Sequence, residues 1–150
     1  MPFKTLALGG LVVGALDLLD AVVFFGLRSG VRPVRVFQSI AAGLLGRAAF
    51  SGGAQAAVLG VFLHFLIAFL IVCTCYALSR FIPFMTGHVL VSGILFGIGA
   101  YFVMNDLVIP LSATSRGTFA WPVFLNGLAI HAFGIGVPAV WFVARAGRHL

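Results

Sequence analysis

Long apolar stretches separated by short polar segments dominate the hydropathy pattern of this chain. Apolar windows cover about residues 6–27, 54–78, 88–109 and 122–144. A helix needs about 20 apolar residues to cross hydrocarbon about 30 Å thick, and each window is long enough. Pro110 marks the end of the third window, and Pro122 suits the first turn of the fourth helix. The pattern predicts an all-α integral membrane protein: a four-transmembrane-helix bundle forming a single transmembrane domain, residues 1–150.

The segment of about residues 33–50, between the first two windows, has a shorter and more polar pattern. Apolar side chains recur at helical spacing, at Val34, Phe37, Ile40, Ala41, Leu44 and Leu45. Arg35, Gln38 and Ser39 lie off that stripe. This pattern is typical of an amphipathic helix in the plane of a membrane interface, and a re-entrant helix is the alternative.

Four basic residues surround this segment and are candidates for binding lipid headgroups: Arg28, Arg32, Arg35 and Arg47. A basic residue near an anionic lipid surface gains about 1 kcal/mol. The alternative is simple anchoring at the interface, without specific headgroup binding. In either case the sequence predicts membrane lipid as a partner.

Composition excludes several other classes of protein. Hydrophobic residues make up 62% of the chain and charged residues only 8%, which is too few to cover a soluble surface. The formal net charge is +6, but the basic residues lie between apolar windows rather than on one polar face. We therefore expect no nucleic-acid partner. Cys73 and Cys75 lie inside an apolar window and are expected to be packing residues.

An even number of spans places both termini on the same side of the membrane. Basic residues are divided almost evenly between the two sides, so the positive-inside rule does not fix the orientation. We name the two faces by their loops. The first face carries both termini, and the second carries the 28–53 and 110–121 loops.

Polar residues inside the spans share helix faces with small residues. Asp17 follows Gly14 by three positions, and His64 and His131 each follow a glycine by four. At 1.5 Å per residue, Asp17, His64 and His131 all lie about 13–15 Å from the second face. The remaining candidates lie between that level and the second face: Asp20, Asn105 and Asn126.

A charge at such a depth costs at least about 2.5–3.5 kcal/mol, so these groups are expected to meet one another, a cavity or a ligand. One hypothesis is a pocket that binds or conducts an ion, a proton or a small ligand through these six residues. His64, His131 and an Asp also fit a metal such as zinc. The alternative is an Asp–His hydrogen bond that only fixes helix register.

Two further hypotheses belong to other classes of protein. His64 and His131 could ligate a b-type haem, because they lie on different helices at matching depth. In that reading the protein transfers electrons. The chain could instead be a non-catalytic accessory or assembly subunit, either as a homo-oligomer or within a larger membrane complex, because glycine faces favour docking between helices.

The sequence favours a non-enzymatic role, because no nucleophile with an adjacent base is apparent in it. A lipid-modifying Asp/His site near the second face stays open as an alternative. The segment Arg35–Gly46, together with Leu63-His64-Phe65 and Ile130-His131-Ala132-Phe133, resembles small four-span inner-membrane proteins of bacteria. The resemblance implies a multi-pass protein of the bacterial cytoplasmic membrane and carries no mechanism with it.

Overall fold

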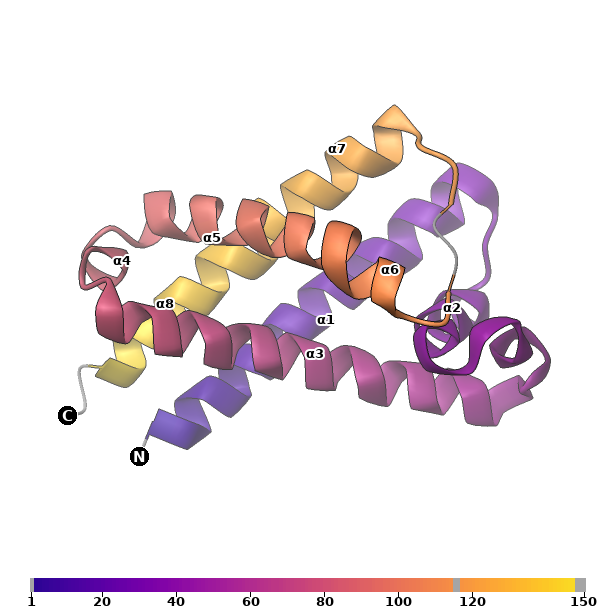
Figure 1. Cartoon of the computed structure of the whole chain (residues 1–150), viewed down its shortest axis with the longest axis horizontal. Helices are drawn as coiled ribbons and strands as arrows, with labels where there is room; N and C mark the ends of the chain where they lie inside the picture. Colours follow the sequence, from indigo (N-terminus) through magenta and orange to yellow (C-terminus); the bar gives the residue numbers. More distant parts are fainter. Residues whose placement is uncertain (1, 115–116, 148–150) are drawn as a thin grey trace.

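The structure of the protein, a computed structural model, describes residues 2–114 and 117–147 (Figure 1). Helices make up 90% of it, and no strand occurs within those two ranges. The long helices run roughly along the length of the molecule. The first helix begins and the last one ends at the same end of the bundle, on the left in Figure 1.

Four helices in the described ranges are long and apolar enough to cross a membrane, as predicted. Their full extents are Phe3–Ser29, Gly53–Phe81, Val89–Leu111 and Trp121–Gly147. The first corresponds to α1 (Pro2–Ser29) and the second to α3 (Gly53–Phe81). The third consists of α5 (Val89–Val103), η2 (Met104–Val108) and α6 (Ile109–Leu111). The fourth consists of α7 (Trp121–Ala129), η3 (Ile130–Gly136) and α8 (Val137–Gly147).

The segment between the first two long helices is helical, as predicted, but its buried face differs from the predicted one. It forms α2 (Pro33–Leu45) and the 3₁₀ helix η1 (Gly46–Ser51), which pack at the right-hand end of α3 (Figure 1). The polar Gln38 is buried, and its Nε2 donates to the Gly53 carbonyl oxygen over 3.1 Å. Val34 and Leu44, from the apolar stripe, are exposed.

The reason for this difference lies in the contact between α2 and α3. A Cβ atom at Gly60 would collide with the carbonyl oxygen of Phe37, so the glycine lets the two backbones approach closely. The face of α2 that fits there carries Ala41 and Ala42, which are fully buried. Much of the apolar stripe is thereby left on the outside. Gly60, the glycine four residues before His64, therefore faces α2.

The tightest core fills the half of the bundle where α1 begins and α8 ends. It is built from small and medium-sized apolar side chains of α1, α3, η3 and α8 together with Met85 of α4 (Phe84–Gly87). Its buried members are Leu6, Val13, Ala68, Val72, Cys75, Met85, Ile135, Ala139, Val140, Val143 and Ala146. The half nearer to α2 holds no comparable cluster of large buried residues among those described, and the candidate site lies there.

Glycines bring α5 and the last long helix into close contact. A Cβ atom at Gly97 would collide with the carbonyl oxygen of His131, and one at Gly136 would collide with that of Gly93. Close approach through small residues is the usual way for helices to pack in lipid. This contact fixes the position of the backbone that carries His131 relative to α5.

Two long helices contain a widened π-helical segment, and each segment precedes a proline. In η2 the Ile109 amide bonds to the Met104 carbonyl, and in η3 the Val137 amide bonds to that of Ala132. Pro110 and Pro138 follow within two residues. A proline removes one helical hydrogen bond and its ring clashes with the carbonyl four residues earlier, which a wider turn relieves. Pro110 was predicted to end this helix near residue 109. The helix instead continues through Pro110 to Leu111.

Candidate functional site

A cavity of about 960 Å³ occupies the half of the bundle nearer to α2. Side chains from α1, α2, α3, α5, η2, α7 and η3 line it, so every long helix contributes. Most of the wall is apolar and includes Phe24, Phe25, Ile40, Ile67, Met104, Val108 and Ile130. The polar side chains are concentrated at its two ends. We call the end with Asp17 the floor and the end with Arg32 the rim.

Asp17 and His64 form the first polar pair of the floor. His64 Nε2 lies 3.9 Å from Asp17 Oδ2 and 2.8 Å from the carbonyl oxygen of Gly14 on α1. Because a carbonyl oxygen only accepts, the proton of this contact sits on His64 Nε2. Nδ1 of the neutral ring is then an acceptor. The Asp17 side chain is 26% exposed, and no hydrogen bond to its carboxylate is found among the described residues.

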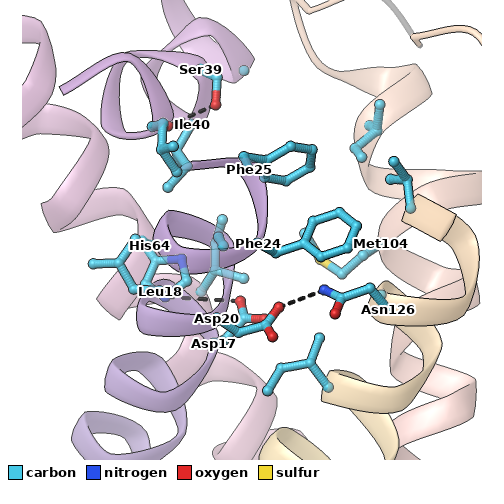
Figure 2. Close-up of a pocket in the computed structure, with 18 of the residues that line it drawn as sticks. Asp17, Leu18, Asp20, Phe24, Phe25, Ser39, Ile40, His64, Met104 and Asn126 are labelled. Atoms are coloured by element: carbon cyan, nitrogen blue, oxygen red, sulfur yellow. Dashed lines mark hydrogen bonds and ion pairs between the residues drawn. The ribbon is translucent and has the colours of Figure 1, made fainter. Parts of the chain in front are cut away.

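Asp20 and Asn126 form the second polar pair. Asn126 Nδ2 donates to Asp20 Oδ2 over 2.7 Å, which joins α7 to α1. Figure 2 shows the two aspartates side by side, with His64 on one side and Asn126 on the other. Asp20 and Asn126 also line a second, outer groove of about 420 Å³, which includes Arg28 and Leu27.

His131 completes the floor from η3. Its Nδ1 lies 2.9 Å from the carbonyl oxygen of Gly127, one turn earlier, so Nδ1 carries the proton and the neutral ring keeps an acceptor at Nε2. The ring of Tyr101 meets it edge to face, with centroids 5.3 Å apart. Gly127 leaves room for this aromatic ring, because a Cβ atom there would lie 2.7 Å from Tyr101 Cε2.

The remaining candidates lie higher on the wall and around the rim. Asn105 lines the cavity and donates from Nδ2 to the Tyr101 carbonyl oxygen over 2.9 Å. Arg35 is held at the rim by the Phe50 carbonyl oxygen, 3.1 Å from Nη1, and its guanidinium lies 4.9 Å from the centre of the Phe50 ring. Arg32 lines the same rim, whereas Arg47 is exposed and does not line the cavity.

The predicted site residues therefore fall into two groups. Asp17, Asp20, His64, Asn126 and His131 meet at the floor of one cavity, and Asn105 lies on its wall. Arg28 faces the outer groove, away from the rim that holds Arg32 and Arg35.

Sequence reasoning missed Tyr101 and the aromatic wall of Phe24 and Phe25. Tyr101 could have been found, since it lies four residues before Asn105 on the same helix face. The two phenylalanines carry no comparable sequence signal, because the chain has 16 phenylalanines and most of its segments are apolar.

A metal ion and a haem make different demands on these donor groups. Across residues 2–114 and 117–147, no group of three or more His, Cys, Asp or Glu side chains is arranged to hold a metal ion. Axial haem ligation by both histidines needs a free ring nitrogen on each. Each neutral ring keeps one such nitrogen, Nδ1 of His64 and Nε2 of His131, because the other nitrogen donates to a backbone carbonyl oxygen. The described side chains thus do not fit a metal ion, whereas the hydrogen bonds of the two histidines leave haem ligation open.

No protein-family model matches this sequence, and no similar curated protein or solved structure was found. The functional argument therefore depends on the cavity and its side chains.

Proposed function

We propose that this chain is a multi-pass membrane protein whose cavity binds a small ligand at the floor formed by Asp17, Asp20, His64, Asn126 and His131. The observation that carries this proposal is the convergence of these five side chains, from α1, α3, α7 and η3, on one cavity whose wall is mostly apolar. A small number of polar groups that converge in a mostly apolar pocket is typical of ligand sites.

Insertion in a membrane is supported by the outer surface. Large apolar side chains are exposed along the long helices, among them Leu11, Leu19, Phe62, Leu70, Leu95 and Phe133. Contiguous apolar surface of this extent is rare on soluble monomers. Trp121 and Trp141 are both exposed, and the 20 residues between them correspond to about 30 Å of helix. This separation suits one aromatic side chain at each interface.

The size of the cavity favours a small organic ligand over a bare ion. Pockets for drug-sized molecules have volumes of about 300–1,000 Å³, and the cavity of about 960 Å³ lies at the top of that range. A single ion would leave most of the apolar wall uncovered. A proton or an ion remains a second occupant of the floor, because intramembrane carboxylates and histidines commonly serve as carriers.

Native mass spectrometry of the protein, extracted from its own membranes in mild detergent, tests this function. We expect a non-covalent small-molecule adduct on the wild-type chain and its loss in I67W, which fills the cavity wall. Asp17→Asn and Asp20→Asn should also weaken the adduct. Their matched control is Asp106→Asn, because Asp106 is exposed and does not line the cavity. An adduct that survives I67W, or no adduct on the wild type, contradicts the proposal.

A second part of the proposal concerns membrane lipid at the α2 end. Arg28, Arg32, Arg35 and Arg47 lie around α2, and the exposed Val34, Leu44 and Leu45 give that helix an uncovered apolar surface. Basic and apolar groups side by side suit an interface of anionic lipid. We propose that α2 and η1 lie in this interface, with these arginines contacting headgroups.

A further inference from the structure

We infer that the ligand of this cavity carries a protonated amine on an apolar body, with the amine at the floor. The inference rests on the proposed function and names the chemical class of the ligand. It follows from which hydrogen-bonding groups at the floor are already used inside the protein and which are left for a ligand.

The floor presents acceptors. Asp17 and Asp20 bring two carboxylates, and the hydrogen bond from Asn126 uses one oxygen of Asp20. The contact of His64 with Gly14 and that of His131 with Gly127 fix both ring protons on nitrogens that face backbone carbonyls. In the neutral rings the remaining nitrogens, Nδ1 of His64 and Nε2 of His131, accept.

Two of the amide donors of the same region are directed to protein atoms. Asn126 Nδ2 donates to Asp20, and Asn105 Nδ2 donates to the carbonyl oxygen of Tyr101. A ligand that offers only acceptors would leave the carboxylates and ring nitrogens of the floor without donors, at a cost in unpaired polar groups. A group with several N–H donors and a positive charge fits the floor, and an ammonium group has three.

The charge of the floor supports the same class. Two carboxylates lie side by side at the bottom of an apolar cavity, and the nearest basic group that pairs with Asp17 is the His64 ring at 3.9 Å. Carboxylates within a membrane normally face a counter-charge. An ammonium group would donate short, charge-assisted hydrogen bonds to the carboxylates and would also provide their positive counter-charge.

The wall above the floor suits a ligand whose body is apolar or aromatic. Phe24 and Met104 lie next to the two aspartates, and Phe25 lies above Phe24 (Figure 2). Ring faces attract a cation within about 6 Å of their centres, so this wall does not oppose the passage of an amine.

The rim determines how such a molecule is oriented. Arg32 and Arg35 line the opposite end of the cavity from Asp17, and both are positively charged. A cationic group is therefore repelled at the rim and attracted at the floor. A bound amine points its charge toward α1 and α7 and its apolar or weakly polar end toward α2.

Three probes with the same body separate this inference from the proposed function: phenylbutylamine, phenylbutanol and phenylbutyrate. Their binding is measured by equilibrium dialysis against the full chain in lipid nanodiscs, and protein-free nanodiscs correct for partition into lipid. We expect the amine to bind at least about tenfold more tightly than the alcohol or the acid. Asp17→Asn and Asp20→Asn should each weaken the amine by about tenfold, and Asp106→Asn should leave it unchanged.

The amine inference is overturned if the alcohol or the acid binds as tightly, or if amine binding is indifferent to both floor aspartates. In the first case, loss of all three probes in I67W still supports a ligand cavity, so only the ligand class fails. Where an Asp→Asn variant does not fold, as judged by circular dichroism, the comparison of the three probes on the wild-type protein decides. If none of the three binds the wild type, the inference fails, and the native mass spectrum decides whether the cavity binds another ligand.

Discussion

Asn126 on α7 donates a hydrogen bond to Asp20 on α1, with 2.7 Å between Nδ2 and Oδ2. Both residues line the inner cavity and also the outer groove that contains Arg28. The pair therefore stands between the two spaces as well as joining two helices.

Replacing Asn126 by leucine should destabilise the fold modestly. Interhelical polar contacts in membranes are worth about 0.6 kcal/mol on average and up to about 1.7 kcal/mol. We expect the free energy of unfolding to fall by an amount near the upper value. The reason is that the Asp20 carboxylate accepts no other hydrogen bond among the described residues. Reversible unfolding in mixed micelles, followed by circular dichroism, measures the change. Gln55→Leu is the control, since Gln55 is exposed on α3; an equal loss in both variants would refute the role of the pair.

A matched pair of glycine substitutions tests the contact that positions His131. Gly97→Ala places a Cβ atom against the carbonyl oxygen of His131, whereas nothing lies within 4 Å of a Cβ atom at Gly99. Overpacking of this kind costs about 1–3 kcal/mol, so Gly97→Ala should lower the free energy of unfolding. Gly99→Ala should be neutral or stabilising by up to about 1 kcal/mol, because alanine favours helix. Similar unfolding curves for the two variants would show that the α5–η3 contact is looser than described.

The two floor histidines should hold their protons on different ring nitrogens. His64 donates from Nε2 to Gly14 and His131 from Nδ1 to Gly127. In ¹⁵N spectra of histidine-labelled protein, the neutral rings should therefore show opposite tautomers. His88 is exposed and outside the cavity, so its signal, assigned by His88→Gln, serves as the reference. The same tautomer at both floor positions would remove the acceptor pattern on which the ligand class depends.

Arginines at the α2 end should select anionic lipid. We expect Arg28→Gln combined with Arg47→Gln to reduce the preference for anionic over zwitterionic lipid by about fivefold for each residue, corresponding to about 1 kcal/mol. The ratio of co-purifying lipids in native mass spectra reports this preference. Arg80→Gln combined with Arg145→Gln removes the same charge from the far ends of α3 and α8. An equal effect of the two pairs would indicate bulk charge rather than a lipid-binding end.

The long helices were predictable because their signal is carried by length and apolar content alone. The level shared by Asp17 and His64 also followed from simple counting, since α1 and α3 are uninterrupted helices, and the structure places the two side chains 3.9 Å apart. The Asp20–Asn126 pair did not follow from counting. It depends on how α7 crosses α1, and helix crossings are set by packing that a single sequence does not display.

Two other features could not be predicted from the sequence, each for its own physical reason. The buried face of α2 depends on the surface of α3 that it meets, where Gly60 admits the backbone of Phe37 and Ala41. The apolar stripe of α2 alone predicted a different buried face. The continuation of the third long helix through Pro110 depends on the widened turn before it. Local rules describe a regular helix and a proline separately, and they do not combine the two.

The widened segment η3 is a place where the last long helix can lose a residue with little effect on the packing of α8. A regular α-helix turns about 100° per residue, so one residue lost from α8 would rotate every later side chain and turn Val140 and Val143 out of the core. A π-helical turn already holds a surplus residue. Loss of one residue within Ile130–Gly136 would tighten that turn and leave the facing of α8 nearly unchanged, while moving the ring of His131. Small insertions or deletions within η3 during evolution would thus reshape the floor of the cavity and leave the rest of the bundle intact.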